Sequence, residues 1–333
     1  MSYEPDVTRK ALARLERRKD DRERRRFQLE RELYAKAPRL RQLDAALRGT
    51  MIDLAMLATG GRPVAANGQE IAAIRARSEA LQAERTALLA QLGYAPDALD
   101  DVPACPKCGD TGRAEGKMCV CLKELCMREQ LKALTALLNL TDEQDFDKLR
   151  LDVYSDQPWG SQDRSPRENM RRIVMVCEGY ARQFPLYPLK NLLLSGGTGL
   201  GKTFLSGCIA REVSRRGFSV VYDTAGGVFD SFETRRRFDR DPEEQRQARG
   251  NARRYLGCDL LILDDLGSEH TMASTKASLY ELVNGRLQSG RHTIISSNLS
   301  TRDIGSKYGP QLASRIEGLY RELTFYGDDL RLQ

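Results

Sequence analysis

The N-terminal third of the chain repeats apolar residues with the spacing of packed helices. A mostly apolar series with a spacing of three or four residues runs through Leu40, Leu43, Leu47, Thr50, Leu54 and Leu57, and the same spacing returns at Ile71, Ile74, Ser78, Leu81, Arg85, Leu88 and Leu92. This period puts the apolar side chains on one face of each helix. The glycine-rich stretch 59–70 interrupts the pattern, so we expect two antiparallel helices joined by a turn. Pro38 is expected to kink or restart the first helical arm.

The predicted hairpin has two interpretations. It is either a structural strut or dimerisation coil, or a lever that grips a partner protein. Its apolar seams fit both, so the sequence leaves both open.

The pattern changes in the second half of the chain. From about residue 171 helical and strand periods alternate to the end, which is typical of an α/β domain with a mainly parallel sheet. We therefore predict four regions: a helical hairpin or coiled-coil region for partner binding (1–97), a cysteine module (98–130), a linker or lead-in (131–165) and the α/β domain (166–333).

Composition indicates which compartment and which class of protein to expect. The chain has 333 residues, of which 41% are hydrophobic and 30% charged. We expect no membrane helix, because no apolar run approaches the roughly 18 residues that one needs. The first thirty residues contain no signal-peptide core, so we expect a cytoplasmic protein. Thiols stay reduced there, which favours metal binding over disulfides.

The positive charge is concentrated at one end. Residues 1–48 hold 15 Lys and Arg against 9 Asp and Glu, whereas the rest of the chain holds 38 of each, so the net +6 lies in the N-terminal arm. Such a balance is typical of a surface for nucleic acid or an acidic partner. The acids that interleave with the bases also fit an ordinary solvated helix face.

Four of the eight cysteines lie within seventeen residues, in CPKCGDTGRAEGKMCVC. Two closely spaced pairs, Cys105 with Cys108 and Cys119 with Cys121, can converge on one Zn²⁺ as thiolates. The glycines between the pairs permit the tight turns that such a site requires. Cys126 is the alternate fourth ligand. Four thiolates leave no open position on the metal, so we predict a structural zinc site; redox sensing or free thiols are the alternatives.

The stretch NLLLSGGTGLGKTFL contains the phosphate-binding pattern G-x-x-x-x-G-K-[ST] between a predicted strand and a predicted helix. Backbone N–H groups of such a loop face nucleotide phosphates, the lysine neutralises them, and the threonine holds Mg²⁺. The predicted nucleotide-binding residues are Gly196, Gly197, Thr198, Gly199, Leu200, Gly201, Lys202 and Thr203.

Two further strands end in polar residues. CDLLILDDLG places Asp264 to hold Mg²⁺ and Asp265 to polarise the attacking water. Asn298, at the end of HTIISSNLS, is expected beside the γ-phosphate. The chain contains no Asn-Lys-x-Asp pattern for guanine, so ATP is favoured over GTP.

A further arginine-rich stretch lies between two predicted strands. Cations mixed with aromatic rings suit single-stranded DNA, although acids interrupt the stretch and a solvated helical insertion fits it too. The candidate residues are Arg235, Arg236, Arg237, Phe238, Arg253 and Arg254, with Tyr255 as a second ring.

Over roughly residues 90–333 the chain resembles the bacterial DnaC/DnaI-type helicase loaders of the AAA+ ATPases. The resemblance is carried by CPKCGDTG with CVCLK, SPRENM, GGTGLGKTFL, LLILDDLGSE, IISSNLS, YGPQLASRIEG and FYGDDLR. It implies an AAA+ P-loop ATPase domain without a C-terminal lid, preceded by the hairpin and the zinc module. It also implies that Arg315 is an arginine finger acting on a neighbouring subunit, and that Arg331 senses phosphate. A surface salt bridge is the alternative for each arginine.

The sequence departs from the AAA+ pattern in one catalytic residue. Asp265 stands where these enzymes usually carry glutamate, so hydrolysis is expected to be slow or tightly gated. The chain also ends 35 residues after Asn298, which is similar to the loaders that lack a lid.

The resemblance implies an ATP-dependent loader that binds the hexameric replicative helicase and helps place it on single-stranded DNA, with release driven by hydrolysis. Self-association through the ATPase domain is also implied. The alternatives are a transposition helper ATPase similar to IstB and a nucleotide-switched adaptor with little turnover.

Overall fold

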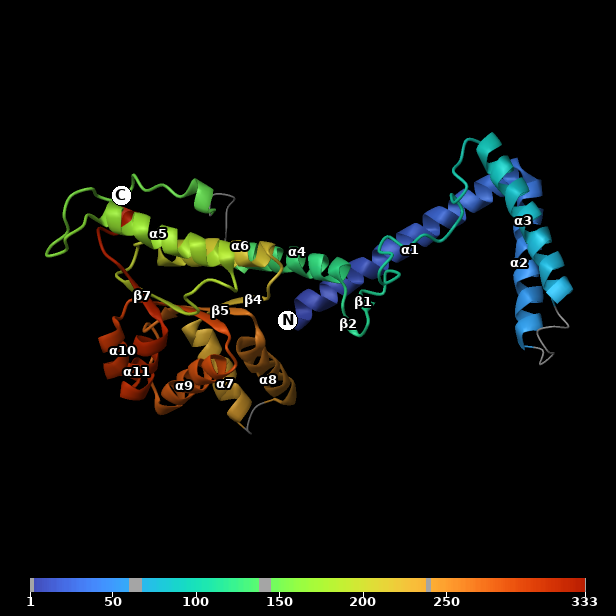
Figure 1. Ribbon diagram of the computed structural model, residues 1–333. Coiled ribbons are helices and arrows are strands. Elements are labelled where there is room, and N and C mark those ends of the chain that lie inside the picture. The colour runs from blue at the N-terminus through green and yellow to red at the C-terminus, as the bar shows by residue number, and fades with distance from the viewer. Residues whose placement is uncertain (1–2, 60–67, 138–144, 238–240, 333) are drawn as a thin grey trace. The chain divides into compact units, whose positions relative to one another are not determined.

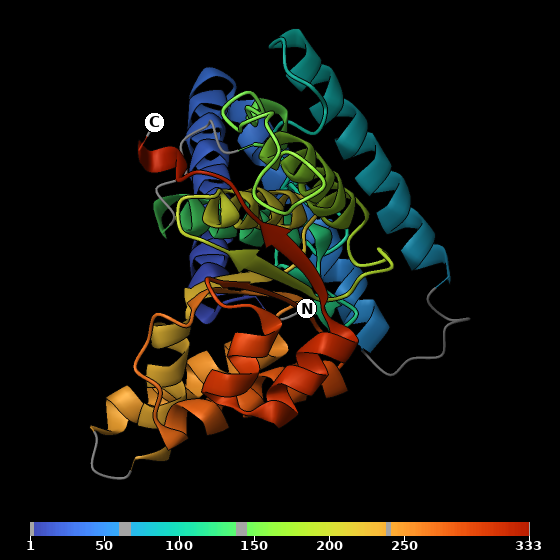
Figure 2. The same cartoon turned by 90° about the vertical axis from the view of Figure 1, so that its left-hand side faces the viewer.

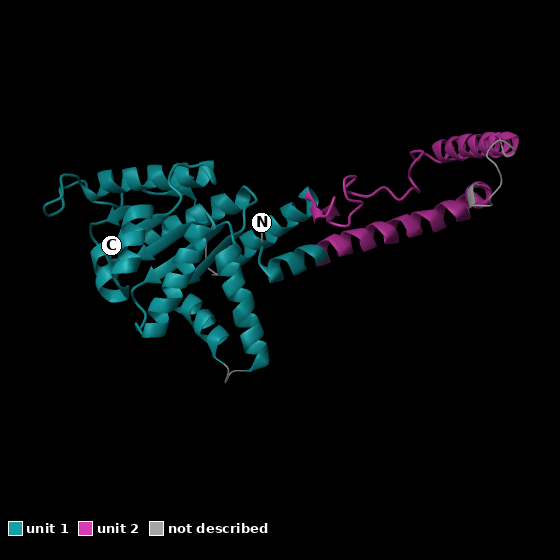
Figure 3. Cartoon of the chain, turned by 60° about the horizontal axis from the view of Figure 1, so that its bottom comes forward, with its two compact units in different colours: residues 1–12, 120–333 teal, residues 13–119 magenta. Residues whose placement is uncertain are grey.

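The computed structural model describes residues 3–59, 68–137, 145–237 and 241–332. The chain forms two compact units, one of Met1–Leu12 with Val120–Gln333 and one of Ala13–Cys119 (Figure 3). The predicted loop 59–70 and the candidate Phe238 lie largely or wholly outside the described residues. None of the described helices combines the length and apolarity that crossing a membrane requires.

The unit Ala13–Cys119 is mainly helical. It contains most of α1 (Pro5–Lys36), then α2 (Pro38–Thr59), α3 (Gly68–Gln91) and a small hairpin of β1 (Arg113–Ala114) and β2 (Lys117–Met118). The predicted restart at Pro38 is confirmed, because α1 ends two residues before it.

The predicted seams are buried or half-buried along both α2 and α3. Leu33, Leu40 and Leu89 are fully buried where these helices meet the end of α1. Arg85 of α3 ties the two helices further, donating to Asp44 at 2.8 Å and to Asp100 at 3.0 Å. The predicted helical hairpin is therefore confirmed.

The second unit contains a five-stranded sheet in which every strand runs parallel, in the order β4-β5-β6-β3-β7 (Figure 1). The strands are β3 (Leu192–Gly196), β4 (Val220–Thr224), β5 (Leu260–Leu266), β6 (His292–Ser297) and β7 (Arg321–Phe325). The predicted α/β domain with a parallel sheet is confirmed.

Helices cover both faces of the sheet (Figures 1 and 2). One face packs against α5 (Pro166–Gln183) and α6 (Lys202–Arg215). The other packs against α7 (Ala225–Arg236), α8 (Pro242–Gly257), α9 (Ala273–Gln288), α10 (Thr301–Tyr308) and α11 (Pro310–Leu319). Successive residues of β3 enter opposite cores, Leu192 and Leu194 on one side and Leu193 on the other. A strand buried on both faces is apolar throughout, which is why LLL precedes the P-loop.

The edge strand β4 is held by a side chain from α4 (Val120–Leu137). Gln130 accepts a hydrogen bond from the Val220 N–H at 2.9 Å and donates to the Phe218 carbonyl at 2.9 Å. An exposed edge would leave these backbone groups unpaired. Helix α4 therefore acts as a cover for this edge of the sheet.

Candidate functional site

The predicted phosphate-binding loop joins β3 to α6 through a run of glycines with positive φ. Gly196, Gly199 and Gly201 have φ of 137°, 71° and 92°. A Cβ at Gly196 would lie 2.2 Å from the Phe325 carbonyl oxygen, so no larger residue fits between the loop and β7. Helix α6 starts at Lys202 with no side-chain cap, which leaves its first N–H groups for a bound anion.

This loop borders a cavity of about 770 Å³ that gathers most of the predicted site residues. Lys202 is largely buried there, and its ammonium donates to the carbonyls of Gly196 at 2.6 Å and Gly197 at 2.5 Å. It also donates to Asn298 Oδ1 at 2.9 Å, which joins two groups 96 residues apart in the sequence. Burial lowers the pKa of Lys202 from its ordinary value.

The two acids that follow β5 line the same cavity. Asp264 Oδ2 lies 3.3 Å from Thr203 Oγ1, so the pair offers the oxygen donors that Mg²⁺ takes. Asp265 has a φ of +56°, an uncommon conformation for a residue other than glycine.

A β-bulge explains that conformation. Leu263 pairs with Ile295 and Leu266 with Ser297, so two residues of β5 face the single residue Ser296 of β6. The extra residue re-aims the Asp265 side chain towards the cavity. Strain of this kind persists where the surrounding structure fixes it, which is typical of functional sites.

Two residues that the sequence analysis missed hold the Asp264 carboxylate. Tyr222 of β4 donates its hydroxyl to Oδ2 at 2.5 Å, and Ser296 of β6 donates to Oδ1. Burial, followed by the nearby Asp264 charge, raises the pKa of Tyr222, which keeps its hydroxyl protonated as a donor. No local signal marked either residue, because both strands carry further polar residues, Asp223 and Thr224 in β4 and His292, Thr293 and Ser297 in β6.

The lead-in region, predicted only as a linker, also contributes to the cavity. The Tyr154 hydroxyl donates to the Leu200 carbonyl at 3.2 Å. The other lead-in residues that line the cavity are Lys148, Leu149, Arg150 and Val153. The lead-in thus adds apolar and basic side chains to the cavity lining.

The two arginines implied by the family resemblance occupy different places. Arg331, in the short helix η3 (Leu330–Leu332), lines the cavity, and the neighbouring Leu330 N–H donates to the Gly199 carbonyl at 3.2 Å. Arg315 of α11 lies outside the cavity. Its guanidinium donates to the Tyr280 hydroxyl at 2.9 Å and stacks over that ring at 5.2 Å.

Several candidate DNA-binding arginines have partners within the chain. Arg235 and Arg236 both pair with Glu281, at 2.7 and 2.6 Å, and Arg254 pairs with Glu4. Arg237 and Arg253 are exposed. Tyr255 is 1% exposed, so its ring offers no surface on which a base can stack.

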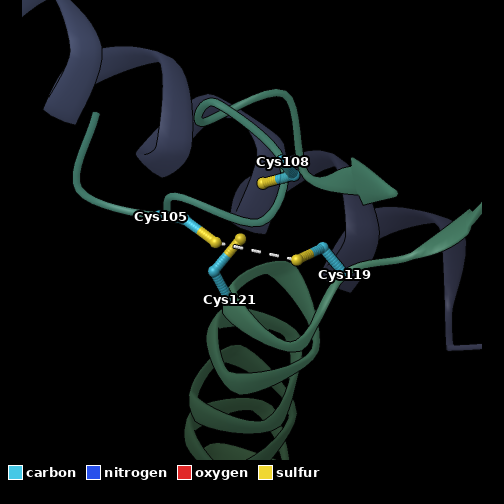
Figure 4. A group of neighbouring side chains, drawn as sticks. All are labelled: Cys105, Cys108, Cys119 and Cys121. Atoms are coloured by element: carbon cyan, nitrogen blue, oxygen red, sulfur yellow. Dashed lines mark hydrogen bonds between the residues drawn. The ribbon is translucent and has the colours of Figure 1, made fainter. Parts of the chain in front are cut away.

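The four clustered cysteines converge (Figure 4). All four sulfurs lie within 4.8 Å of one another. The Cys105 and Cys119 sulfurs are 3.7 Å apart, close to the roughly 3.8 Å expected when Zn–S bonds of about 2.3 Å form a tetrahedron. Cys126 is fully buried and outside the group, so the geometry favours the ligand set Cys105, Cys108, Cys119 and Cys121.

The loop that carries the first cysteine pair is fixed by an acid. Asp110 accepts hydrogen bonds from the N–H groups of Ala104 at 3.0 Å and Cys105 at 2.8 Å, and it pairs with Arg22. Hydrogen bonds from Arg22 and these N–H groups outweigh burial and lower the Asp110 pKa. Residues Gly109, Asp110, Gly112, Glu115 and Gly116 take positive φ, which closes the turns between the pairs.

The other three cysteines are buried, as expected for core thiols. Burial raises the pKa of Cys177, Cys208 and Cys258, so these thiols stay protonated. Thiolate chemistry in this protein therefore centres on the four-cysteine group.

The sheet, the loop and the paired acids define a P-loop ATP-binding domain. The sequence profile of the IstB-like ATP binding protein family matches residues 187–316. The chain is 25% identical over 165 residues to the replicative helicase loader DnaC of Buchnera aphidicola subsp. Baizongia pistaciae, covering 49% of this chain and 65% of the loader. It is 32% identical over 124 residues to the ATP-binding protein of insertion sequence IS1162 of Pseudomonas fluorescens, covering 35% of this chain and 48% of that protein.

A crystal structure of the DnaC helicase loader superposes with a TM-score of 0.42 at 19% identity, over 54% of this chain and 98% of that one. The matched region spans 65% of the length of the Buchnera DnaC protein and 48% of the length of the IS1162 protein. The chain contains an ATP-binding domain similar to those of IstB and DnaC, and the predicted resemblance to DnaC-type loaders is confirmed for this domain.

A structural zinc site predicts a metal content that can be measured. Protein purified under reducing, chelator-free conditions is expected to contain about one zinc ion per chain by elemental analysis, because four thiolates complete one tetrahedral site. Cys105→Ser should lose the metal and melt at a lower temperature. Cys126→Ser is the control and should keep the metal; zinc-free wild-type protein would contradict the assignment.

The hydrogen bonds to Asp264 predict that loss of the Tyr222 hydroxyl weakens nucleotide binding only when Mg²⁺ is present. Tyr222→Phe removes only the hydroxyl that orients the carboxylate, and loss of such an outer partner costs about 10-fold or more in metal affinity. Titration of a fluorescent ATP analogue should show weaker binding with Mg²⁺ and unchanged binding in EDTA. Tyr255→Phe is the matched control, since its hydroxyl donates to Asp223, outside the cavity lining. Equal binding by both variants would rule out this role of Tyr222.

Proposed function

We propose that this chain is an ATP-dependent loader that binds the replicative DNA helicase and helps place it on single-stranded DNA. The observation that carries the proposal is the union of two parts in one chain. One is an ATPase domain of the IstB/DnaC-like class. The other is a helical unit with a four-cysteine site, whose closed ligand set offers no chemistry of its own. A unit with no catalytic groups of its own is suited to bind a partner protein.

In this mechanism the P-loop N–H groups and Lys202 bind the ATP phosphates. Thr203 and Asp264 would hold Mg²⁺, which supplies charge neutralisation on the phosphates. Asp265 accepts the proton of the attacking water, and Asn298 orients that water from its position against Lys202. The bulge supports this role for Asp265, because it directs the carboxylate towards the cavity.

Hydrolysis then depends on assembly. Arg315 lies outside its own cavity, on a surface where Tyr280 holds it by a hydrogen bond and a ring contact. It is therefore available to a neighbouring copy of the chain, where a guanidinium would stabilise the charge that develops on the transferred phosphoryl group. Self-association would thereby switch ATP turnover on.

An IstB-like transposition helper is the second candidate. It is favoured by the family match over residues 187–316 and by the similarity to the IS1162 protein. The helical hairpin and the cysteine site favour the loader. The two functions differ in their partners, since one needs the helicase and the other a transposase on duplex DNA.

The catalytic assignment predicts a loss of turnover without loss of binding. Asp265→Asn keeps the side-chain size and tolerates the positive φ, but it removes the proton acceptor. Steady-state ATPase activity with helicase and DNA is expected to fall about 100-fold or more. Asp230→Asn, an exposed acid on α7, is the control and should be unaffected. Near-zero turnover in wild type and variants alike would instead favour the nucleotide-switched adaptor.

The loader proposal predicts a complex that ATP hydrolysis dissolves. Full-length chain mixed with the replicative helicase of its own organism should elute as one species on size-exclusion chromatography with mass detection. With Mg²⁺ and ATP the wild-type complex should dissociate, whereas the Asp265→Asn complex should persist. Absence of any complex, together with ATPase activity stimulated by duplex DNA and transposase, would establish the alternative.

A further inference from the structure

The middle of α1, residues 16–26, carries most of its arginines and its acids on different sides of the helix. At about 100° per residue, positions 17, 18, 24 and 25 fall within roughly 120° of one another. All four are exposed arginines, and we call Arg17, Arg18, Arg24 and Arg25 the arginine face. Within residues 16–26 Asp21 is the one acid in that arc, and it lies three or four positions from each of the four arginines.

The acids that interleave in the sequence lie elsewhere on the helix. Glu16, Asp20 and Glu23 are exposed and fall within about 60° of one another, on a different side from the arginine face. Of the acids in this stretch only Asp21 therefore lies within the arginine face, while Asp20, four positions before Arg24, borders it. The same helical period that mixes the charges along the sequence separates them around the helix.

The third side of this helix is turned inwards. Leu15 and Leu33 are buried on this side. Arg22 and Arg26 fall on the same side of the helix and are half-buried. Arg22 pairs with Asp101 and Asp110, and Arg26 with Asp101 at 3.7 Å. The helix thus separates arginines that stabilise the fold from arginines that face solvent.

The arginine face keeps an excess of positive charge, because its four arginines surround a single carboxylate, Asp21. In the part of the chain that the structure describes, no carboxylate lies within ion-pair distance of Arg17, Arg18, Arg24 or Arg25. Arg25 makes one hydrogen bond, to the Asp21 carbonyl of its own helix at 3.1 Å. Four guanidinium groups around one carboxylate leave a net positive surface, which attracts polyanions.

We propose that the arginine face is a binding surface for the phosphate backbone of a single-stranded nucleic acid. All four cations are arginines, whose planar forks match phosphate oxygens in two parallel hydrogen bonds. This surface is separate from the candidate arginines of α7 and α8, several of which are paired within the chain. It also does not depend on the proposed loader function.

The composition of the face favours nucleic acid over an acidic protein. Protein interfaces are centred on buried aromatic or aliphatic anchors. No apolar side chain lies among these four arginines: Leu15 is buried inwards, and the exposed Phe27 falls on the side of the acids. A phosphate backbone needs only charge and donors, which are what the face provides.

The acids favour a single strand over a duplex. A helix is about 10–12 Å across, and the major groove is about 12 Å wide, so a helix seated there brings both flanks close to phosphates. The flank with Glu16, Asp20 and Glu23 would then face one strand and repel it. A single strand touches the arginine face alone.

The test uses the full-length chain and a fluorescent dT oligonucleotide of about 16 nucleotides, within the usual site size. Binding is measured by anisotropy over a salt series. The variant replaces Arg17, Arg18, Arg24 and Arg25 by glutamine, which retains helix propensity. The control replaces four other exposed arginines of the same unit by glutamine, which gives an identical net charge: Arg31, Arg41, Arg75 and Arg77.

The variant is expected to bind at least 10-fold more weakly at about 0.1 M salt. The slope of log K against log salt should fall by about 3, since each lost phosphate contact on a single strand removes about 0.7. The control should keep both the affinity and the slope of wild type.

Three outcomes would overturn the proposal. Equal losses in variant and control would assign the effect to net charge alone. Tighter binding of a duplex of the same length would reject the single-strand assignment. A variant that binds DNA normally but no longer forms the helicase complex would make this face a protein interface. Circular dichroism checks that both variants keep the helical content of wild type.

Discussion

Parallel pairing of β3, β5 and β6 is the constraint on which the ATP site depends. Since the strands run in one direction, their carboxyl ends share one edge of the sheet, and the loops that follow them meet there. The P-loop follows β3, the two acids close β5, and Asn298 follows β6. The hydrogen bond between Lys202 and Asn298 is a consequence of this arrangement. An antiparallel order would send these residues to opposite edges.

The bulge in β5 places the two adjacent acids in different environments. Consecutive residues of a regular strand point to opposite faces, so only one of them would reach the site. With the extra residue, Asp264 is held by Tyr222, Ser296 and Thr203, while Asp265 reaches the same cavity with its carboxylate exposed. One acid is fixed by neighbours and suits a metal. The other is open to solvent and suits the activation of water.

Local patterns allowed much of this molecule to be predicted. The P-loop, the strand ending in two acids and the two helical seams are each encoded within about twenty residues, and each was found at the predicted place. The four cysteines are also local, so their convergence followed from spacing and glycine content. The partners that are far apart in sequence were missed: Tyr222 meets Asp264 across two strands, and Tyr154 reaches the P-loop from a region predicted to be a linker. No local period records such contacts, because they depend on strand order and on how a segment packs.

The arginines combine a feature that local sequence predicts with one that depends on contacts between distant residues. The sequence reports the number of charges, and a helical period alone assigns each charge to a side of α1. Burial is what decides which side meets solvent, and burial depends on Asp101 and Asp110, about eighty residues away. The same holds for α7 and α8, where arginines predicted as DNA-binding candidates instead form ion pairs with Glu281 and Glu4. A basic stretch therefore becomes a binding surface only where the fold leaves its cations without acids of their own.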